Sequence, residues 1–189
     1  MIFNQHYSLR DKHAFFGASN YHWVNYTDDK IRDSYLNAKA KEIGTAKHKF
    51  AADAIKLKIK LPKTSKTLDR YVNDAIGFNM IPEQILYVSE ECFGTTDAIN
   101  FNEKTLILRI HDLKNGKTPA SMMQLRIYAA MFCLEYKYSP NDLKKIILRI
   151  YQNDDVVEEI AEPTDILYIM DKIKKNITIV ETLKSEGLT

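Results

Sequence analysis

The sequence predicts a mixed α/β domain of the α+β kind, in which helices flank a mixed central sheet and the N-terminal region is helical. Three observations support this class. The first third of the chain has helical patterns with few breakers, the middle alternates apolar and polar residues as strands do, and helices and strands then alternate to the end. This order is typical of helices packed on a mixed sheet. The 189 residues are expected to form a single domain, residues 1–189.

The N-terminal part, residues 1–80, is expected to be mainly helical. Residues 28–42 contain no helix breaker, and Gly44-Thr45 opens a second helical run that reaches residue 59 before Pro62 stops it. Ser65 is a candidate N-cap for a third helix over residues 66–76.

Strand patterns begin after Pro82. Three strands are expected at residues 84–93, 95–101 and 105–112, with a tight connection at 102–104 between the last two. Turn-forming residues then fill positions 115–119.

The remaining elements alternate in type. A long helix is expected over residues 120–136, and Pro140-Asn141 ends it. Residues 143–151 have the pattern of a buried strand, with 156–160 paired to it as a hairpin, so the sheet core covers residues 84–160. Pro163 precedes a closing helix at 164–184.

The composition limits the classes of protein to consider. Because the formal charge is only +2, a nucleic-acid partner would need a local basic patch; the nine lysines between residues 39 and 66 are candidates, and a solvated helix face is the alternative interpretation. Two cysteines are too few for a disulfide framework and indicate a reducing cytoplasm. No apolar run approaches the ~20 residues of a membrane span, and no signal peptide is recognisable, so no membrane contact is expected.

Two acids and a lysine mark the ends of neighbouring strands. In the third strand, side chains alternate so that an apolar face ends in Asp112 and Lys114, and a hairpin would bring Asp97 of the preceding strand to the same end. Two adjacent carboxylates repel each other, and a divalent cation such as Mg²⁺ removes the conflict. Lys114 would then orient or activate a water. The alternative is a buried Asp–Lys pair with a structural role.

Three more polar residues point to the same place. Gln124 and Tyr128 interrupt an otherwise apolar helix at an i, i+4 spacing, so they line one face; they either bond to each other or face Lys114. His48 shares an apolar stripe with Ala52 and Ile55. A lone inward histidine is usually a core residue, but beside two acids it is a credible metal ligand.

These segments together resemble the RecB-like branch of the PD-(D/E)XK nuclease superfamily over residues 44–151. The resemblance lies in four motifs: Gly44-Thr45-Ala46-Lys47-His48, Gly94-Thr95-Thr96-Asp97-Ala98-Ile99, Ile110-His111-Asp112-Leu113-Lys114-Asn115-Gly116 and Gln124-Leu125-Arg126-Ile127-Tyr128. Ser19 and Trp23 are also similar to positions in compact phage and CRISPR-associated members.

The resemblance implies a restriction-endonuclease-like core and a role for each residue. His48, Asp97 and Asp112 would hold Mg²⁺ or Mn²⁺, with the backbone carbonyl of Leu113 as a further ligand. Lys114 would assist the attacking water, and Gln124 and Tyr128 would support Lys114 and the scissile phosphate. The candidate DNA contacts beyond this site are Lys47, Lys49, Asn115 and Lys117.

The expected function is therefore that of a metal-dependent DNA nuclease, an exonuclease of DNA recombination, repair or phage DNA processing. It would act in a bacterial cytoplasm, or in the host cytoplasm if a phage encodes it. Many compact relatives carry four cysteines, so this chain is expected to lack their iron–sulfur cluster. A helicase or recombination protein would be a separate chain, and the oligomeric state stays open. The alternatives are a non-catalytic DNA-binding or assembly module with the same fold, and an interaction domain whose carboxylates are structural.

Overall fold

The computed structural model describes residues 7–9, 14–116 and 118–187. The chain divides into two compact units, residues 1–43 and 44–189, and each is described by itself. No helix in the described part of the chain has both the length and the apolar character needed to cross a membrane.

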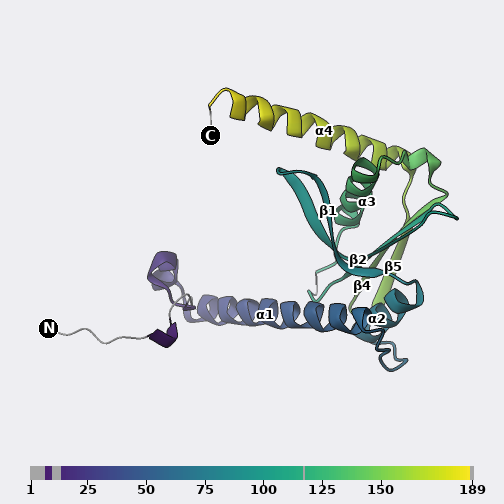
Figure 1. Ribbon diagram of the computed structural model, residues 1–189. Helices are drawn as coiled ribbons and strands as arrows, with labels where there is room; N and C mark the ends of the chain where they lie inside the picture. The colour runs from purple at the N-terminus through teal and green to yellow at the C-terminus, as the bar shows by residue number, and fades with distance from the viewer. Residues whose placement is uncertain (1–6, 10–13, 117, 188–189) are drawn as a thin grey trace. The chain divides into compact units, whose positions relative to one another are not determined.

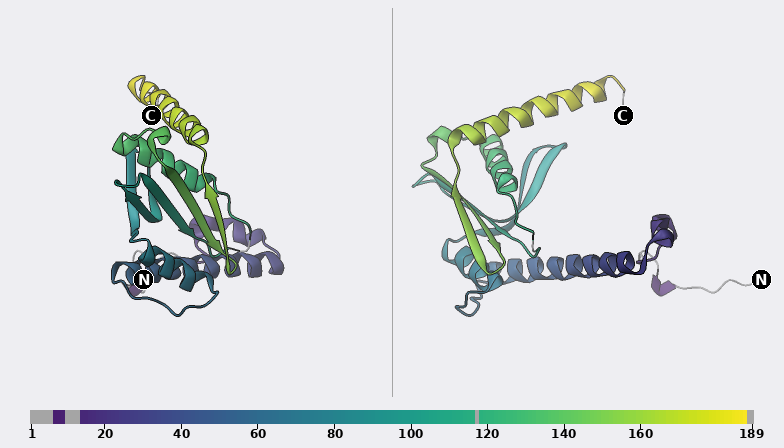
Figure 2. Two further views of the ribbon diagram at one scale, coloured as in Figure 1. Left: turned by 90° about the vertical axis from the view of Figure 1, so that its right-hand side faces the viewer. Right: turned by 180° about the vertical axis from the view of Figure 1, so that it is seen from behind.

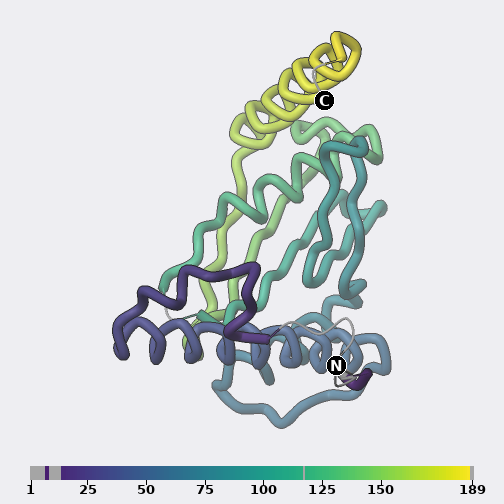
Figure 3. Tube along the Cα trace, turned by 90° about the vertical axis from the view of Figure 1, so that its left-hand side faces the viewer, coloured from purple at the N-terminus to yellow at the C-terminus, as the bar shows by residue number. Residues whose placement is uncertain are grey.

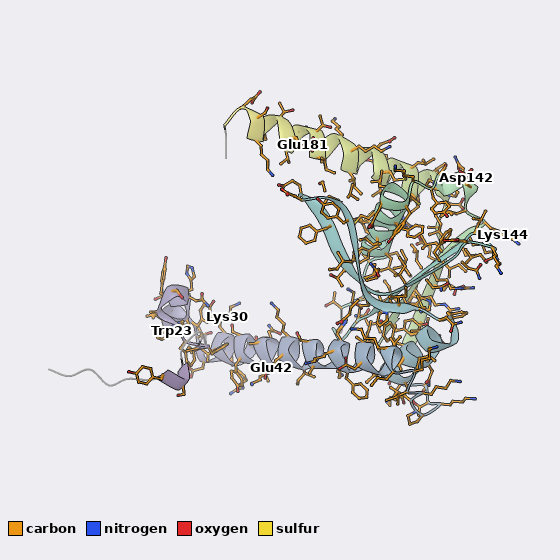
Figure 4. The ribbon with its side chains drawn as sticks, in the orientation of Figure 1. Trp23, Lys30, Glu42, Asp142, Lys144 and Glu181 are labelled. Atoms are coloured by element: carbon orange, nitrogen blue, oxygen red, sulfur yellow. The ribbon has the colours of Figure 1, made fainter. Side chains whose placement is uncertain are left out.

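The first unit is a short helical segment with an aromatic cluster. It contains two 3-10 helices, η1 (Tyr7–Leu9) and η2 (Ala18–Asn25), and the first part of α1 (Asp28–Lys56). The indole of Trp23, labelled in Figure 4, donates a hydrogen bond to the carbonyl of Gly17 at 3.1 Å, and its ring packs on Phe16. These contacts order the turn that leads into α1.

Helix α1 is continuous from Asp28 to Lys56, so the prediction of two helices separated at residue 43 is wrong. Gly44 lies inside the helix, where a glycine costs only about 1 kcal/mol relative to alanine and need not break it. The helix ends instead where Lys58 adopts a left-handed backbone, with φ of 55°. Figure 3 follows the chain from there into the next helix, α2 (Thr67–Gly77).

The second unit is built on one five-stranded mixed sheet, in the order β1 (Ile81–Ser89), β2 (Cys92–Asn102), β3 (Ile107–Leu113), β4 (Lys145–Gln152) and β5 (Asp155–Ile160). Strands β3 and β4 are parallel, and the other neighbours are antiparallel. Figure 1 shows the strongly twisted sheet with helices on its two faces. The predicted α+β class is confirmed, as is the predicted hairpin of β4 with β5.

Two apolar clusters hold helices to the sheet. On one face, α2 and the end of α1 pack through a cluster that includes Ala51, Ile55, Tyr71, Val72, Leu113 and Tyr151. On the other face, α3 (Met123–Tyr136) packs through Leu125, Ala129 and Phe132 onto Leu108, Ile110 and Leu148. The sheet is therefore covered by helices on both faces near the ends of β3 and β4, and this cover shields residues there from solvent.

Helix α4 (Pro163–Ser185) crosses the end of α3, as the views in Figure 2 show. Its buried residues, Ile166, Ile169 and Met170, all lie in its first half. Farther along, Lys184 forms an ion pair with Glu91 in the turn between β1 and β2. This helix matches the closing helix expected at 164–184.

Two local predictions fail for physical reasons. The break expected between residues 93 and 95 is wrong, because Gly94 lies inside β2 opposite Leu86 and the turn falls at Glu90 and Glu91. The expected cap at Ser65 is also wrong, since Lys66 is the N-cap residue of α2 and makes no side-chain cap bond.

The start of α2 is fixed instead by the turn between β4 and β5. Asn153 and Asp154 have φ of 54° and 59°, as a two-residue hairpin turn of type I′ requires. Asp154 Oδ1 accepts a hydrogen bond from the Thr67 amide at 2.8 Å. The acid that caps the helix is thus supplied by a residue 87 positions away.

Candidate active site

The site lies where β2 separates from β3. The pairing of these strands runs from Asn102↔Ile107 to Ala98↔His111 and then stops. Beyond the last pair, the amide of Leu113 donates a hydrogen bond to Asp97 Oδ2 at 2.8 Å. The side chain of Asp97 therefore satisfies an amide that the strand ladder leaves open, and this bond fixes the direction of its carboxylate.

The other oxygen of Asp97 faces α1. Asp97 Oδ1 lies 3.3 Å from His48 Nδ1, and the two side chains are 23% and 34% exposed. Across from Asp97 in β1, Glu83 has a left-handed backbone with φ of 52°, and this interrupts the regular strand geometry. The histidine predicted from the stripe on α1 and the acid predicted on β2 are thus in contact.

Asp112 and Lys114 form the second half of the site. Asp112 is only 3% exposed, and its Oδ2 lies 3.1 Å from Lys114 Nζ. This ion pair is the one contact of Oδ2, and the oxygen has no further hydrogen-bond partner among the described residues. A buried carboxylate oxygen in this state is unusual and favours a ligand at that position.

The charges of the site are coupled. The hydrogen bond to Asp97 raises the pKa of the His48 imidazole above its ordinary value, with burial and the charge of Lys114 acting in the opposite direction. Burial raises the pKa of the Asp112 carboxyl, and the charge of Asp97 raises it further. Lys114 and His48 oppose that rise. Four side chains thus share one electrostatic environment in which two acids compete for positive charge.

A chain of hydrogen bonds runs from Lys114 to β2 through α3. Lys114 Nζ donates to Gln124 Oε1 at 2.8 Å, Gln124 Nε2 donates to the hydroxyl of Tyr128 at 3.4 Å, and that hydroxyl donates to the carbonyl of Thr95 at 2.7 Å. Both alternatives for Gln124 and Tyr128 hold at once, because they bond to each other and Gln124 also holds the lysine. These hydrogen bonds help to position the Lys114 amine, which also lies 3.1 Å from Asp112 Oδ2.

The donor set suits a hard divalent cation, which prefers carboxylate oxygens and also accepts an imidazole. Among the described residues, however, no three His, Cys, Asp or Glu side chains are already grouped as a metal site. Lys114 Nζ occupies the position beside Asp112, and His48 is bonded to Asp97. Because Lys114 also bonds to Gln124, it can leave Asp112 without losing all its partners. The residues fit a metal in their chemistry, and the incompletely paired oxygen of Asp112 marks where it would bind.

The other predicted site residues have varied positions. Leu113 is buried at the end of β3, between Asp112 and Lys114. Lys47 and Asn115 line a cavity that Lys114 also lines. Lys49 is exposed on α1, outside the residues that line this cavity, and Lys117 lies outside the described residues.

Comparisons with known proteins give little beyond this geometry. No family model matches the chain, and no curated protein matches it. Among solved structures, the crystal structure of SSO0001 is similar at 14% sequence identity with a TM-score of 0.36. The match covers 79% of this chain and spans 66% of the length of that chain.

Sequence reasoning missed several contributors to the site. The carbonyl of Thr95 and the amide of Leu113 are backbone groups, which no side-chain pattern identifies. Asp154 comes to the edge of the site from the β4–β5 turn and pairs there with Lys66, one of the nine lysines considered for a basic patch. The one available signal was the Asn153-Asp154 pair, which is typical of a tight turn but does not indicate what the turn contacts.

Proposed function

We propose that the protein is a divalent-metal-dependent DNA nuclease of the PD-(D/E)XK type that hydrolyses phosphodiester bonds, acting as an exonuclease. The observation that carries the proposal is the buried Asp112 carboxylate, with one oxygen not hydrogen-bonded, beside Lys114 and in the same electrostatic cluster as Asp97 and His48.

Each residue has a role in this proposal. His48, Asp97 and Asp112 would hold Mg²⁺ or Mn²⁺, with the carbonyl of Leu113 as a further ligand. When bound, such an ion supplies positive charge that polarises a phosphate oxygen and promotes ionisation of a water.

Lys114 is the group best placed to act on the reacting atoms. Its amine contacts both Asp112 Oδ2 and Gln124 Oε1, at 3.1 and 2.8 Å, so two partners define its position. From there it would orient the attacking water and stabilise negative charge on the phosphate as the new P–O bond forms and the ester P–O bond breaks. Gln124 and Tyr128 would be positioning residues that hold the amine in place.

The charges of the site also favour hydrolysis of DNA over DNA binding alone. A DNA-binding surface needs cations that face outward, whereas this site buries an acid whose pKa is raised by its surroundings. Lys114 supplies one positive partner, and a bound divalent cation would offset the repulsion between Asp112 and Asp97 more completely. Perturbed acids in a polar recess are typical of catalytic centres.

The test is cleavage of linear and closed-circular DNA, labelled at one 5′ or one 3′ end, in Mg²⁺, Mn²⁺ or EDTA. The proposal expects metal-dependent loss of linear DNA that Asp112→Ala abolishes, with the circles spared; the label released first gives the polarity. Cleavage of the closed-circular DNA would instead identify the protein as an endonuclease. Binding without turnover in any metal would favour the non-catalytic module, and equal turnover by Asp112→Ala would overturn the assignment of the site.

A further inference from the structure

A cavity of about 290 Å³ opens beside the site, and four separate segments of the second unit form it. They are α1, the start of α2, the end of β3 and the β4–β5 turn. Its polar lining includes Lys47, Lys66, Thr67, Lys114, Asn115 and Asp154. Lys114 lines the cavity and also contacts Asp112, so the cavity adjoins the site around Asp112.

Positive charge dominates this cavity. Three lysines line it against a single carboxylate, that of Asp154. Lys66 Nζ lies 2.9 Å from Asp154 Oδ2, and Lys114 is held by Asp112 and Gln124. Lys47 is exposed and forms no ion pair with any described residue. An anion in the cavity would therefore meet at least one amine that is already uncommitted.

The surroundings of Asp154 show that this part of the cavity stabilises a negatively charged oxygen. Its carboxylate takes hydrogen bonds from the Thr67 amide, the Thr67 hydroxyl and Lys66, at 2.8, 3.1 and 2.9 Å. These bonds lower its pKa to about 2, with the lysine as the largest cause. The donors are thus arranged around an oxygen anion, and lysine, threonine and asparagine are the side chains that contact phosphates in nucleic-acid complexes.

We propose that this cavity binds a phosphate group of the nucleic-acid strand, separate from the phosphate that is cleaved at Asp112. The inference rests on the proposed function, because it takes the ligand to be part of the same substrate. It selects Lys66 from the nine candidate lysines and adds the β4–β5 turn to the substrate-binding surface. The phosphate comes either from an internal phosphodiester or from a strand end, and both have the same chemistry.

The experiment measures binding and cleavage separately. Binding of a fluorescently labelled oligonucleotide is followed by anisotropy in EDTA over a range of salt concentrations, and inorganic phosphate is added as a competitor. Lys47→Ala and Lys66→Ala are each expected to weaken binding roughly two- to tenfold and to lower the salt slope by about 1, as loss of one phosphate contact does. In cleavage assays the same variants should raise KM and leave kcat within about twofold.

Asp154→Asn separates an electrostatic role from a structural one. Both Lys66→Ala and Asp154→Asn break the same ion pair, so both lower stability in the same direction. Their effects on the anion are opposite: removal of the lysine weakens binding, whereas removal of the carboxylate strengthens binding of DNA and of inorganic phosphate. Weaker binding by both variants would mean that the turn only supports the fold, and the proposal would be wrong.

Two control lysines test the location. Lys63 lies in the same basic segment but does not line the cavity, and Lys144, labelled in Figure 4, precedes β4 at the opposite end of the sheet. If Lys63→Ala or Lys144→Ala loses as much affinity for DNA as Lys66→Ala does, the loss reflects overall charge. That result would refute the proposal that the cavity binds the phosphate.

Oligonucleotides with phosphate or hydroxyl at each end identify the source of the phosphate. If the loss in Lys66→Ala disappears with one hydroxyl end, the ligand is that terminal phosphate; if the loss persists with all ends, it is internal. Unchanged DNA binding in both lysine variants, with normal cleavage, would refute the phosphate site in the cavity without contradicting the proposed nuclease activity. Charge-dependent binding without cleavage would refute the nuclease and leave the cavity as a phosphate site.

Discussion

Gly94 and Tyr128 meet so closely that a Cβ atom on residue 94 would lie 3.0 Å from Tyr128 Cε1. The glycine is in β2 and the tyrosine in α3, and the contact lets the hydroxyl of Tyr128 reach the carbonyl of Thr95 at 2.7 Å. Glycine thus serves close approach here rather than an unusual backbone angle. The contact links the strand that carries Asp97 to the helix that holds Lys114.

Gly94→Ala should therefore displace the Tyr128 ring by a few tenths of an ångström and weaken its bond to Thr95. We expect a loss of about 1–3 kcal/mol of unfolding free energy from the overpacking. Cleavage should fall more than binding does, since Tyr128 acts by positioning. Gly77→Ala is the matched control, because nothing lies within 4 Å of its added Cβ. Urea denaturation and steady-state cleavage check both; equal stability of the two variants would contradict the account.

Lys114→Met keeps the aliphatic stem and removes the amine. Loss of a group that assists proton transfer or charge stabilisation typically lowers a rate by about 10²–10⁴, so kcat should fall by that order while the folded structure persists. Lys114→Arg should recover little, because a planar guanidinium cannot replace a compact amine between Asp112 and Gln124. Lys104→Met, an exposed lysine in the β2–β3 turn, is the control. A kcat of Lys114→Met within threefold of wild type would argue against its role.

His111 should make the stability depend on pH. It is fully buried in β3, its Nδ1 lies 3.3 Å from the Tyr151 hydroxyl, and burial is the main cause that lowers its pKa to about 3. Since the unfolded histidine binds a proton below about pH 6.5 and the folded one does not, the unfolding free energy falls as the pH drops from 6.5 towards 3. The slope contributed by His111 approaches about 1.4 kcal/mol per pH unit.

Denaturation in EDTA at pH 7, 6 and 5 measures this slope. His111→Phe removes the titrating group and should flatten the curve, although it lowers stability at pH 7. His22→Gln, at an exposed position in the first unit, should keep the wild-type slope. A His111→Phe curve parallel to that of the wild type would show that other groups cause the acid sensitivity.

Local patterns were sufficient to predict most of the fold. The alternation in β3, the apolar face of α3 and the proline before α4 each specify an element without help from distant residues. The α1 break was mispredicted because one glycine is too weak a signal against helical neighbours. The turn near Gly94 was mispredicted because that glycine lies within a strand and leaves room for the Tyr128 ring, which is distant in sequence.

The site was predictable as a set of side chains but not as a geometry. Strand alternation puts Asp112 and Lys114 on one face, and helical spacing pairs Gln124 with Tyr128. The separation of β2 from β3, which aims Asp97 at the Leu113 amide, depends on long-range pairing that the sequence does not reveal. For the same reason the cavity formed with Lys66 and Asp154 could not be predicted.

The most direct measurement is calorimetric titration of the folded protein with Mn²⁺, on wild type, Asp97→Asn and Asp112→Asn. The account predicts that wild type binds one or two ions per chain and is stabilised by them, by about 2.7 kcal/mol at a hundredfold excess over Kd. Both variants should lose the binding heat, and neither should gain stability when Mn²⁺ is added. No Mn²⁺ binding by folded wild type, or unchanged binding in both variants, would contradict the proposed metal centre.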